Sequence, residues 1–199
     1  MIRSENLREC TLPLVILVAG MPGSGKSVVS EAARKIGYDI VRMGDVVREI
    51  ALELGRQTTD ESLGEIALRI RAEYGMNIVA RLTLHKACTG YRNKPIVVEG
   101  IRNLEELDFF KSHAARCYLM AVHASPKTRF LRLTSRGRSD DPRSWEEFVR
   151  RDLRELRMGL GSVIALADVM LINEDKTLDE FMEEAMKTLS TLLKVGDHA

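Results

Sequence analysis

The feature that most limits how this chain can fold is the octapeptide at residues 20–27, which reads Gly-Met-Pro-Gly-Ser-Gly-Lys-Ser. An apolar run at residues 14–19 precedes it, typical of a parallel strand buried on both faces, and a helical pattern follows it. Strand, Gly-x-x-x-x-Gly-Lys-Ser loop and helix in this order form a phosphate-binding loop. Its glycines allow successive backbone N–H groups to turn toward phosphate oxygens, and the N-terminus of the helix adds partial positive charge. The motif therefore predicts an α/β fold that holds a phosphorylated ligand.

Four further short runs rich in Val, Ile or Leu alternate with helical patterns, which favours a parallel sheet. Ser or Thr followed three positions later by Glu predicts a helix start, because the two side chains cap each other's backbone N–H groups. These pairs are Thr58 with Glu61, Ser144 with Glu147, and Thr177 with Glu180. The further strands are expected at residues 38–41, 96–99, 117–122 and 168–172.

We expect residues 1–199 to form a single domain, a three-layer α/β/α fold around a five-stranded parallel sheet. Residues 43–94 contain helical patterns without a strand and are predicted to be a helical insertion. The polar segment 135–143, which includes Gly137 and Pro142, is predicted to be a short lid. The core then comprises residues 12–42, 95–134 and 144–199.

Composition narrows the class of ligand and the compartment. Charged residues make up 30% of the chain but leave a net charge of +1, which argues against a nucleic-acid binder that relies on phosphate contacts. Cys10, Cys88 and Cys117 are odd in number and have no Cys-x-x-Cys spacing, so we predict free thiols in a reducing compartment. Residues 1–13 lack the apolar stretch of a signal peptide, and no run approaches the roughly 20 apolar residues of a membrane span. We therefore expect a cytoplasmic protein without a membrane or nucleic-acid partner.

The last two residues of the loop indicate phosphoryl transfer. In such loops the lysine, here Lys26, reaches the β- and γ-phosphates, and the hydroxyl, here that of Ser27, takes one position on Mg²⁺. The reaction mainly requires alignment of two substrates and neutralisation of their charge, which arginines and Mg²⁺ supply.

Arginines are concentrated in and around the predicted lid. Arg132 and Arg136 lie one helical turn apart before it, Arg138 lies within it, and Arg151 lies on the helix after it. We predict a functional role for Arg136, Arg138 and Arg151, because a polar lid has no core of its own to stabilise. The helix after the lid also carries Arg154 and Arg157, which we interpret as part of a solvated face.

Five segments resemble, in order, adenylate kinase and related nucleoside monophosphate kinases. The first is the loop itself, in the form Gly-x-Pro-Gly-x-Gly-Lys-Ser. The second is residues 44–48, which resemble the family's Gly-Asp-x-x-Arg segment. The third is residues 97–102, which resemble its Asp-Gly-Phe-Pro-Arg segment. The Arg132/Arg136 pair, and Arg138-x-Asp-Asp followed by Arg151, resemble the flanks of the family's lid. The match spans most of residues 14–172. It is nearest to a group of uncharacterised archaeal proteins related to adenylate kinase that read Met-Gly-Asp-Val-Val-Arg and Glu-Gly-Ile-Arg.

This resemblance implies ATP as the donor, Mg²⁺ as the cofactor and a nucleoside monophosphate, AMP, as the acceptor. Arg48 and Arg102 would hold the acceptor phosphate, and Glu99, in place of the family's aspartate, would order water on Mg²⁺. Arg132 would stack on the donor base, while the lid arginines close over the transferring group. The residues that would cradle the donor phosphates are Gly20, Gly23, Ser24, Gly25 and Lys26.

Two other functions fit the same residues. Residues 167–173 resemble the last strand of dephospho-coenzyme A kinase, whose hydroxyl acceptor requires a general base, and Asp45 would be that base. Arg48, three residues later, favours a phosphate acceptor instead, in which case Asp45 orients the helix or the substrate. The departures from the family, including Glu99 and the short lid, also permit a nucleotide sensor that binds ATP or AMP and hydrolyses ATP slowly.

Overall fold

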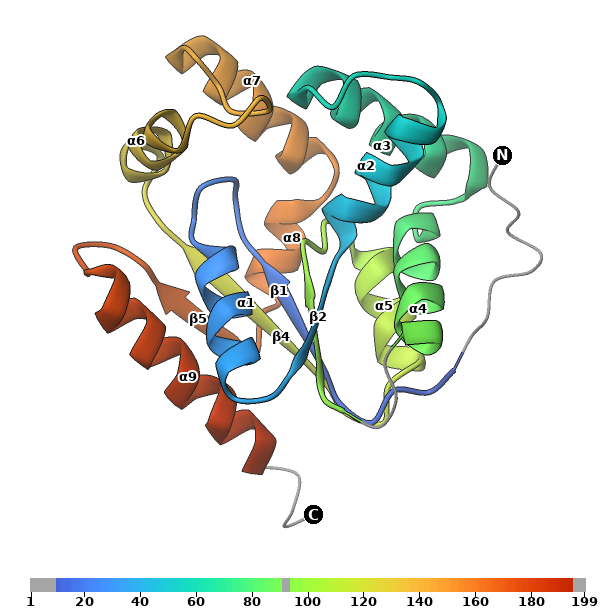
Figure 1. The fold of residues 1–199 in the computed structure, drawn as a ribbon, viewed down its shortest axis with the longest axis vertical. Helices are drawn as coiled ribbons and strands as arrows, with labels where there is room; N and C mark the ends of the chain where they lie inside the picture. Colours follow the sequence, from blue (N-terminus) through green and yellow to red (C-terminus); the bar gives the residue numbers. More distant parts are fainter. Residues whose placement is uncertain (1–9, 91–93, 195–199) are drawn as a thin grey trace.

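Five parallel strands form one sheet in the order β2-β3-β1-β4-β5 in the computed structural model, which describes residues 10–90 and 94–194 (Figure 1). The predicted fold class, three layers around a five-stranded parallel sheet, is confirmed. All five predicted strands are present, with bounds that differ from the predictions by no more than one residue. They are β1 (Val15–Ala19), β2 (Asp39–Arg42), β3 (Ile96–Glu99), β4 (Cys117–His123) and β5 (Val169–Ile172). The part of the signal-peptide argument that concerns residues 1–9 lies outside the described residues.

The central strand β1 is buried on both faces, which explains its continuous apolar run. Its alternate residues Ile16 and Val18 face a core shared with α1 (Lys26–Lys35) and α9 (Leu178–Lys194). Val15 and Leu17 face the opposite core. The helices packed on that side include α4 (Ile78–Gly90), α5 (Leu104–Ser112) and α8 (Leu160–Ala165).

Two groups of helices stand beyond the carboxyl ends of the strands, facing one another (Figure 1). One group is α2 (Met43–Glu53) and α3 (Asp60–Tyr74); the other is α6 (Pro126–Arg136) and α7 (Trp145–Arg157). The described residues between β2 and β3 contain three helices and no strand, as the sequence predicts. The segment predicted as a lid connects α6 to α7. Its residues Arg138 and Asp140 line the same cleft as the phosphate loop, which follows β1.

Two of the three predicted helix caps are confirmed. Ser144 accepts from the N–H of Glu147 at the start of α7, and Thr177 and Glu180 cap each other reciprocally before α9. The third prediction is wrong by one residue, because Thr59 rather than Thr58 accepts from the N–H of Ser62. Adjacent threonines leave the sequence pattern ambiguous, and the first helical residue decides which hydroxyl faces the free N–H groups.

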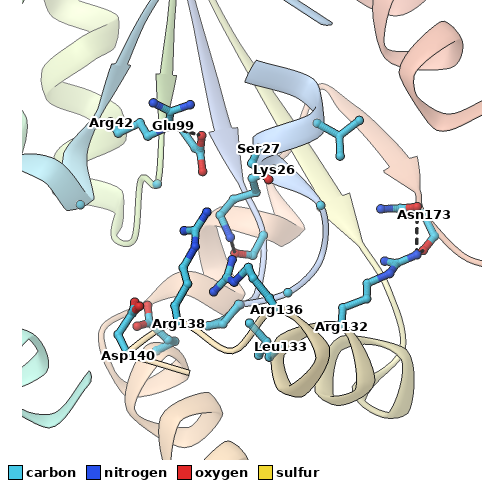
Figure 2. A pocket seen from close by; sticks show the side chains of 18 of the residues that line it. Lys26, Ser27, Arg42, Glu99, Arg132, Leu133, Arg136, Arg138, Asp140 and Asn173 are labelled. Atoms are coloured by element: carbon cyan, nitrogen blue, oxygen red, sulfur yellow. Dashed lines mark hydrogen bonds and ion pairs between the residues drawn. The ribbon is translucent and has the colours of Figure 1, made fainter. Parts of the chain in front are cut away.

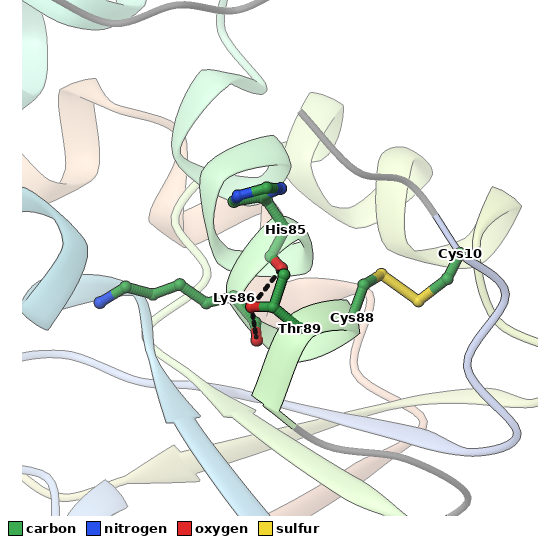
Figure 3. The surroundings of a disulfide bond; sticks show 5 residues. All are labelled: Cys10, His85, Lys86, Cys88 and Thr89. Atoms are coloured by element: carbon green, nitrogen blue, oxygen red, sulfur yellow. Dashed lines mark hydrogen bonds between the residues drawn. A yellow bond between two sulfur atoms is a disulfide. The ribbon is translucent and has the colours of Figure 1, made fainter. Parts of the chain in front are cut away.

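The prediction that all three cysteines are free is wrong, because Cys10 and Cys88 form a disulfide (Figure 3). The two residues are 78 positions apart, and their proximity arises from the fold. Leu12 bridges to Ala114 beside β4, which brings the chain before β1 against the helices of this face, where Cys88 lies on α4. Cys117 is free as predicted, and burial raises the pKa of its thiol to about 11.

Among the helices of the described residues, none has the length and apolar character that crossing a bilayer requires.

Candidate active site

A cleft of about 700 Å³ opens at the carboxyl ends of the strands, between the two helix groups (Figure 2). It brings together residues from all five segments that resemble the nucleoside monophosphate kinases. The predicted site residues that line it are Gly20, Gly23, Gly25, Lys26, Ser27, Asp45, Arg48, Glu99, Arg102, Arg132, Arg136, Arg138 and Arg151.

The phosphate loop curls around the ammonium group of Lys26. Lys26 Nζ donates to the carbonyl oxygens of Gly20 at 2.7 Å and Met21 at 3.2 Å. Burial lowers the pKa of Lys26 to about 8, against the opposing effect of the Glu99 and Glu155 carboxylates. A cation held only by carbonyl oxygens in a cleft is poised to exchange these partners for phosphate oxygens.

Gly25 must be glycine for two reasons. Its φ of 109° lies in the left-handed region, and a Cβ there would approach Asn173 Nδ2 to 2.2 Å. Asn173 Nδ2 donates to the carbonyl of Ser24 at 2.9 Å, and Arg132 donates to the Asn173 carbonyl and side-chain oxygens. Asn173, which follows β5, is therefore hydrogen-bonded both to the phosphate loop and to Arg132, the arginine expected at the donor base.

Ser24 is the one predicted site residue whose side chain the structure does not bring to the cleft. The residue is fully buried, and its N–H donates to the carbonyl of Met21 at 3.1 Å. Of the four x positions in the motif, Pro22 and Gly23 line the cleft, whereas Met21 and Ser24 do not, and the sequence does not say which of them turns inward.

The carboxylate of Glu99 lies at the carboxyl end of β3, next to the loop (Figure 2). Its Oε2 accepts from Ser30 Oγ at 2.6 Å and from Arg42 Nε at 3.2 Å. With the Ser27 hydroxyl it supplies two hard oxygen donors at one side of the cleft. The described residues contain no cluster of three or more His, Cys, Asp or Glu suited to a metal. Two oxygen donors suit Mg²⁺, which takes few protein ligands and completes its shell with water and substrate phosphates.

The two arginines expected to hold the acceptor form ion pairs with carboxylates of the chain. Arg48 on α2 contacts Asp45 at 3.5 Å and Asp140 of the lid segment at 3.7 Å. Arg102 Nε donates to Glu155 Oε2 at 2.7 Å, and this carboxylate holds the pKa of Arg102 above its usual range.

The arginines in and beside the segment predicted as a lid also contact groups of the chain itself. Arg136 makes a two-pronged contact with Asp141, with Nε to Oδ2 at 2.9 Å, and Arg138 donates to Asp141 through its backbone N–H. Arg151 donates to the Asp140 carbonyl at 2.8 Å. Arg136 and Arg138 extend toward the end of the Lys26 side chain (Figure 2).

A second cavity of about 90 Å³ adjoins the cleft between α2, α3 and α7, and residues that the sequence analysis missed line it. Asp60, the first residue of α3, forms ion pairs with Arg151 at 3.0 Å and Arg154 at 2.6 Å. A Cβ on Gly64 would lie 2.7 Å from Arg154 Nε, so this glycine makes room for the arginine. The prediction that Arg154 belongs to a solvated face is therefore wrong, because this residue connects α7 to α3. Its spacing of three from Arg151 is visible in the sequence, whereas Asp60 lies 94 residues away.

Solved structures with the same fold include kinases of small molecules. TT1252 from Thermus thermophilus aligns with a TM-score of 0.63 at 21% identity, over 92% of this chain and all of that chain. Shikimate kinase from Bacteroides thetaiotaomicron aligns with a TM-score of 0.60 at 14% identity, over 91% and 98% of the two chains. A gluconokinase from Sinorhizobium meliloti aligns with a TM-score of 0.53 at 19% identity, over 92% and 94%. At these identities the likeness shows a P-loop kinase fold, which is broader than the adenylate kinase resemblance predicted from sequence.

Sequence relatives define the family. A profile of the AAA-domain family matches residues 16–155, which include the phosphate loop and both lid flanks. A UPF0200 protein of Hyperthermus butylicus is 49% identical over 92% of this chain and 97% of its own length. Another from Staphylothermus marinus is 47% identical over 90% and 91%. The chain therefore belongs to the UPF0200 family and has a P-loop domain with the fold of small-molecule kinases.

Proposed function

We propose that this protein transfers the γ-phosphoryl group of ATP to a nucleoside monophosphate, AMP. The observation that carries the proposal is the distribution of arginines on two sides of Lys26. Arg48 and Arg102 approach from the α2 side and from β3, whereas Arg132, Arg136 and Arg138 approach from α6 and the lid. Nine lysines and arginines line the cleft against four acidic residues, so it suits two polyanionic substrates together.

On the donor side, the backbone of the phosphate loop and Lys26 bind the triphosphate, and Arg132 lies where the base enters. Ser27 and Glu99 would hold Mg²⁺, which neutralises charge on the donor phosphates when bound. Arg136, Arg138 and Arg151 then approach the transferring group and exclude water that would otherwise hydrolyse ATP. On the acceptor side, Arg48 and Arg102 orient the attacking phosphate oxygen.

The second candidate function is phosphorylation of a hydroxyl group on the acceptor. It is suggested by Asp45, which lines the cleft beside Arg48. Shikimate and gluconate, which name two structural neighbours, are hydroxy acids, and a hydroxyl acceptor must lose its proton during transfer. Asp45 would take that proton. A monophosphate needs no such base, since its attacking oxygen is largely ionised near pH 7.

An acceptor panel with the Arg48→Ala variant tests the proposal. We expect ATP turnover with AMP, and we expect Arg48→Ala to raise the KM for AMP by about 10- to 100-fold, through loss of a charge-assisted contact, while the KM for ATP stays within about twofold. Initial rates with AMP, CMP, UMP, GMP, dephospho-coenzyme A, shikimate and gluconate provide the measurement. Arg56→Ala, an exposed arginine on the loop after α2, is the matched control.

The panel also separates the alternatives. Turnover of a hydroxyl compound with no monophosphate accepted would select the second candidate. Tight AMP binding without phosphorylation of any acceptor would select a nucleotide sensor. Equal losses of ATP and AMP binding in Arg48→Ala would contradict the acceptor assignment.

The lowered pKa of Lys26 predicts that ATP affinity depends on pH. Triphosphate binds the ammonium form, whose pKa in the free protein is about 8. Affinity should therefore be nearly constant from pH 7 to 8 and should weaken toward tenfold per pH unit above 8, with a proton taken up on binding. Titration calorimetry of Mg·ATP in buffers of different ionisation enthalpy measures both effects. An affinity that stays constant to pH 9.5, without proton uptake, would contradict this role for Lys26.

A further inference from the structure

Arg129 on α6 is nearly fully buried, with 3% of its surface exposed, and it does not line the cleft. Its guanidinium makes a two-pronged ion pair with Asp152 of α7, with Nη1 to Oδ1 at 2.8 Å and Nη2 to Oδ2 at 2.6 Å. The ion pair therefore joins the helix before the lid to the helix after it. Asp152 immediately follows Arg151, one of the arginines of the cleft.

The same residue contacts the phosphate loop through both its side chain and its backbone. Arg129 Nη1 also donates to the carbonyl of Pro22 at 3.2 Å. A Cβ on Gly23 would lie 2.8 Å from the Arg129 carbonyl oxygen and 3.2 Å from its Cα, so the loop packs directly on the α6 backbone here. Movement of the Pro22–Gly23 turn therefore acts directly on Arg129.

An aromatic cluster surrounds the pair on its outer side. The Arg129 guanidinium lies 4.9 Å from the centre of the Phe148 ring, which packs against Phe130 and Trp145. Trp145, the first residue of α7, is the only tryptophan of the chain. Its fluorescence is therefore a site-specific report on the joint between α6 and α7.

Stability alone does not explain a buried pair of this kind. Replacing a buried ion pair by well-packed apolar residues is often neutral or stabilising, because the pair must recover the cost of removing two charges from water. The pair instead provides a fixed hydrogen-bonding geometry, which apolar residues cannot provide. Arg129 holds the loop carbonyl, α6 and α7 in one register.

We propose that Arg129 is a positioning residue that connects the phosphate loop to α7, so that nucleotide bound in the loop sets the position of Arg151. The proposal deepens the proposed function, since it requires nucleotide binding at the loop, but it does not depend on which acceptor is used. Arg129 acts through Pro22, Gly23 and Asp152 and does not touch the reacting groups.

The test replaces the pair with apolar residues, Arg129→Met with Asp152→Leu, and follows Trp145 emission during titration with Mg·ATP. In the unaltered protein we expect ATP to change the emission. In the double variant we expect the emission response to fall by more than about 80%, while the calorimetric Kd for ATP changes less than about fivefold. The unfolding temperature should fall by only a few degrees, because the carbonyl oxygens of Pro22 and Ala124 lose their donor while both charges of the pair are removed together. The rate of phosphoryl transfer at saturating ATP should fall about 10- to 100-fold, which appears in kcat rather than in the KM for ATP.

A matched control removes a comparable ion pair elsewhere. Arg71 of α3 and Glu106 of α5 form a fully buried pair, and Arg71→Met with Glu106→Gln removes it while leaving an acceptor for the N–H of Arg102. This control should keep the Trp145 response. Arg129→Lys, which cannot engage Asp152 in two places and Pro22 together, provides a milder second variant and should lose part of the response.

The outcomes separate this inference from the proposed function. Failure of the unaltered protein to bind ATP would contradict the proposed function. ATP binding without a change in Trp145 emission, or a full response retained in both Arg129 variants, would overturn the connection through Arg129 while leaving the kinase proposal intact.

Discussion

Replacing Lys26 with methionine is expected to lower kcat/KM for phosphoryl transfer about 10³-fold, because it removes the cation that we propose binds the β- and γ-phosphates inside the cleft. Methionine matches the length of the lysine stem but provides no donor. The effect should appear in both ATP binding and turnover, since in the proposed reaction Lys26 contacts the donor before and during transfer. Calorimetry with Mg·ATP and initial rates with the best acceptor measure the two parts.

A lysine on the same helix provides the control. Lys35 is exposed in the last turn of α1, and Lys35→Met should leave both quantities unchanged. A folded Lys26→Met protein that binds Mg·ATP as tightly as the unaltered protein would contradict the assignment of the cleft as a triphosphate site.

Loss of the Cys10–Cys88 disulfide should produce the largest change in stability. The bond closes a loop across a separation of 78 residues. Cross-linking a loop of this size lowers the entropy of the unfolded chain and so raises the free energy of unfolding by about 4 kcal/mol. In a protein of this length such a loss corresponds to a fall of about 10 °C in Tm. Thermal unfolding with and without a reductant, monitored by circular dichroism, measures it.

Serine variants make this prediction specific. Cys10→Ser, Cys88→Ser and the double variant should all show the same loss, because each of them opens the same loop. Cys117→Ser is the control, since that thiol is free and its raised pKa makes it unreactive. A reductant that leaves the Tm of the unaltered protein unchanged would contradict the prediction.

Local patterns predicted most of the fold and of the cleft. The phosphate loop, the strands and the segments around Asp45 and Glu99 depend on neighbouring residues, and parallel strands bring their carboxyl ends to one sheet edge. This is why residues from separate motifs, such as Arg48 and Arg136, meet in one cleft.

Pairings between distant residues could not be predicted in the same way. The Cys10–Cys88 bond, the contact of Asp60 with Arg154 and the Arg129–Asp152 pair each join segments that approach only after the helices pack. Their residue types are visible in the sequence, but a charged residue on a helix has many equivalent partners until the fold selects one. The Thr58 error is of a different kind, since it is a shift of one position within a correctly recognised motif.

The carboxylates that hold the cleft arginines have a consequence for which anions can enter. Arg48, Arg102 and Arg136 are each already neutralised by an Asp or Glu of the chain. A singly charged ion such as chloride offers these arginines no more charge than the carboxylate it would displace, and it lacks the tether that keeps the carboxylate near. A phosphate dianion offers more charge and more oxygens. The internal pairs should therefore make the cleft select phosphorylated ligands over monovalent anions.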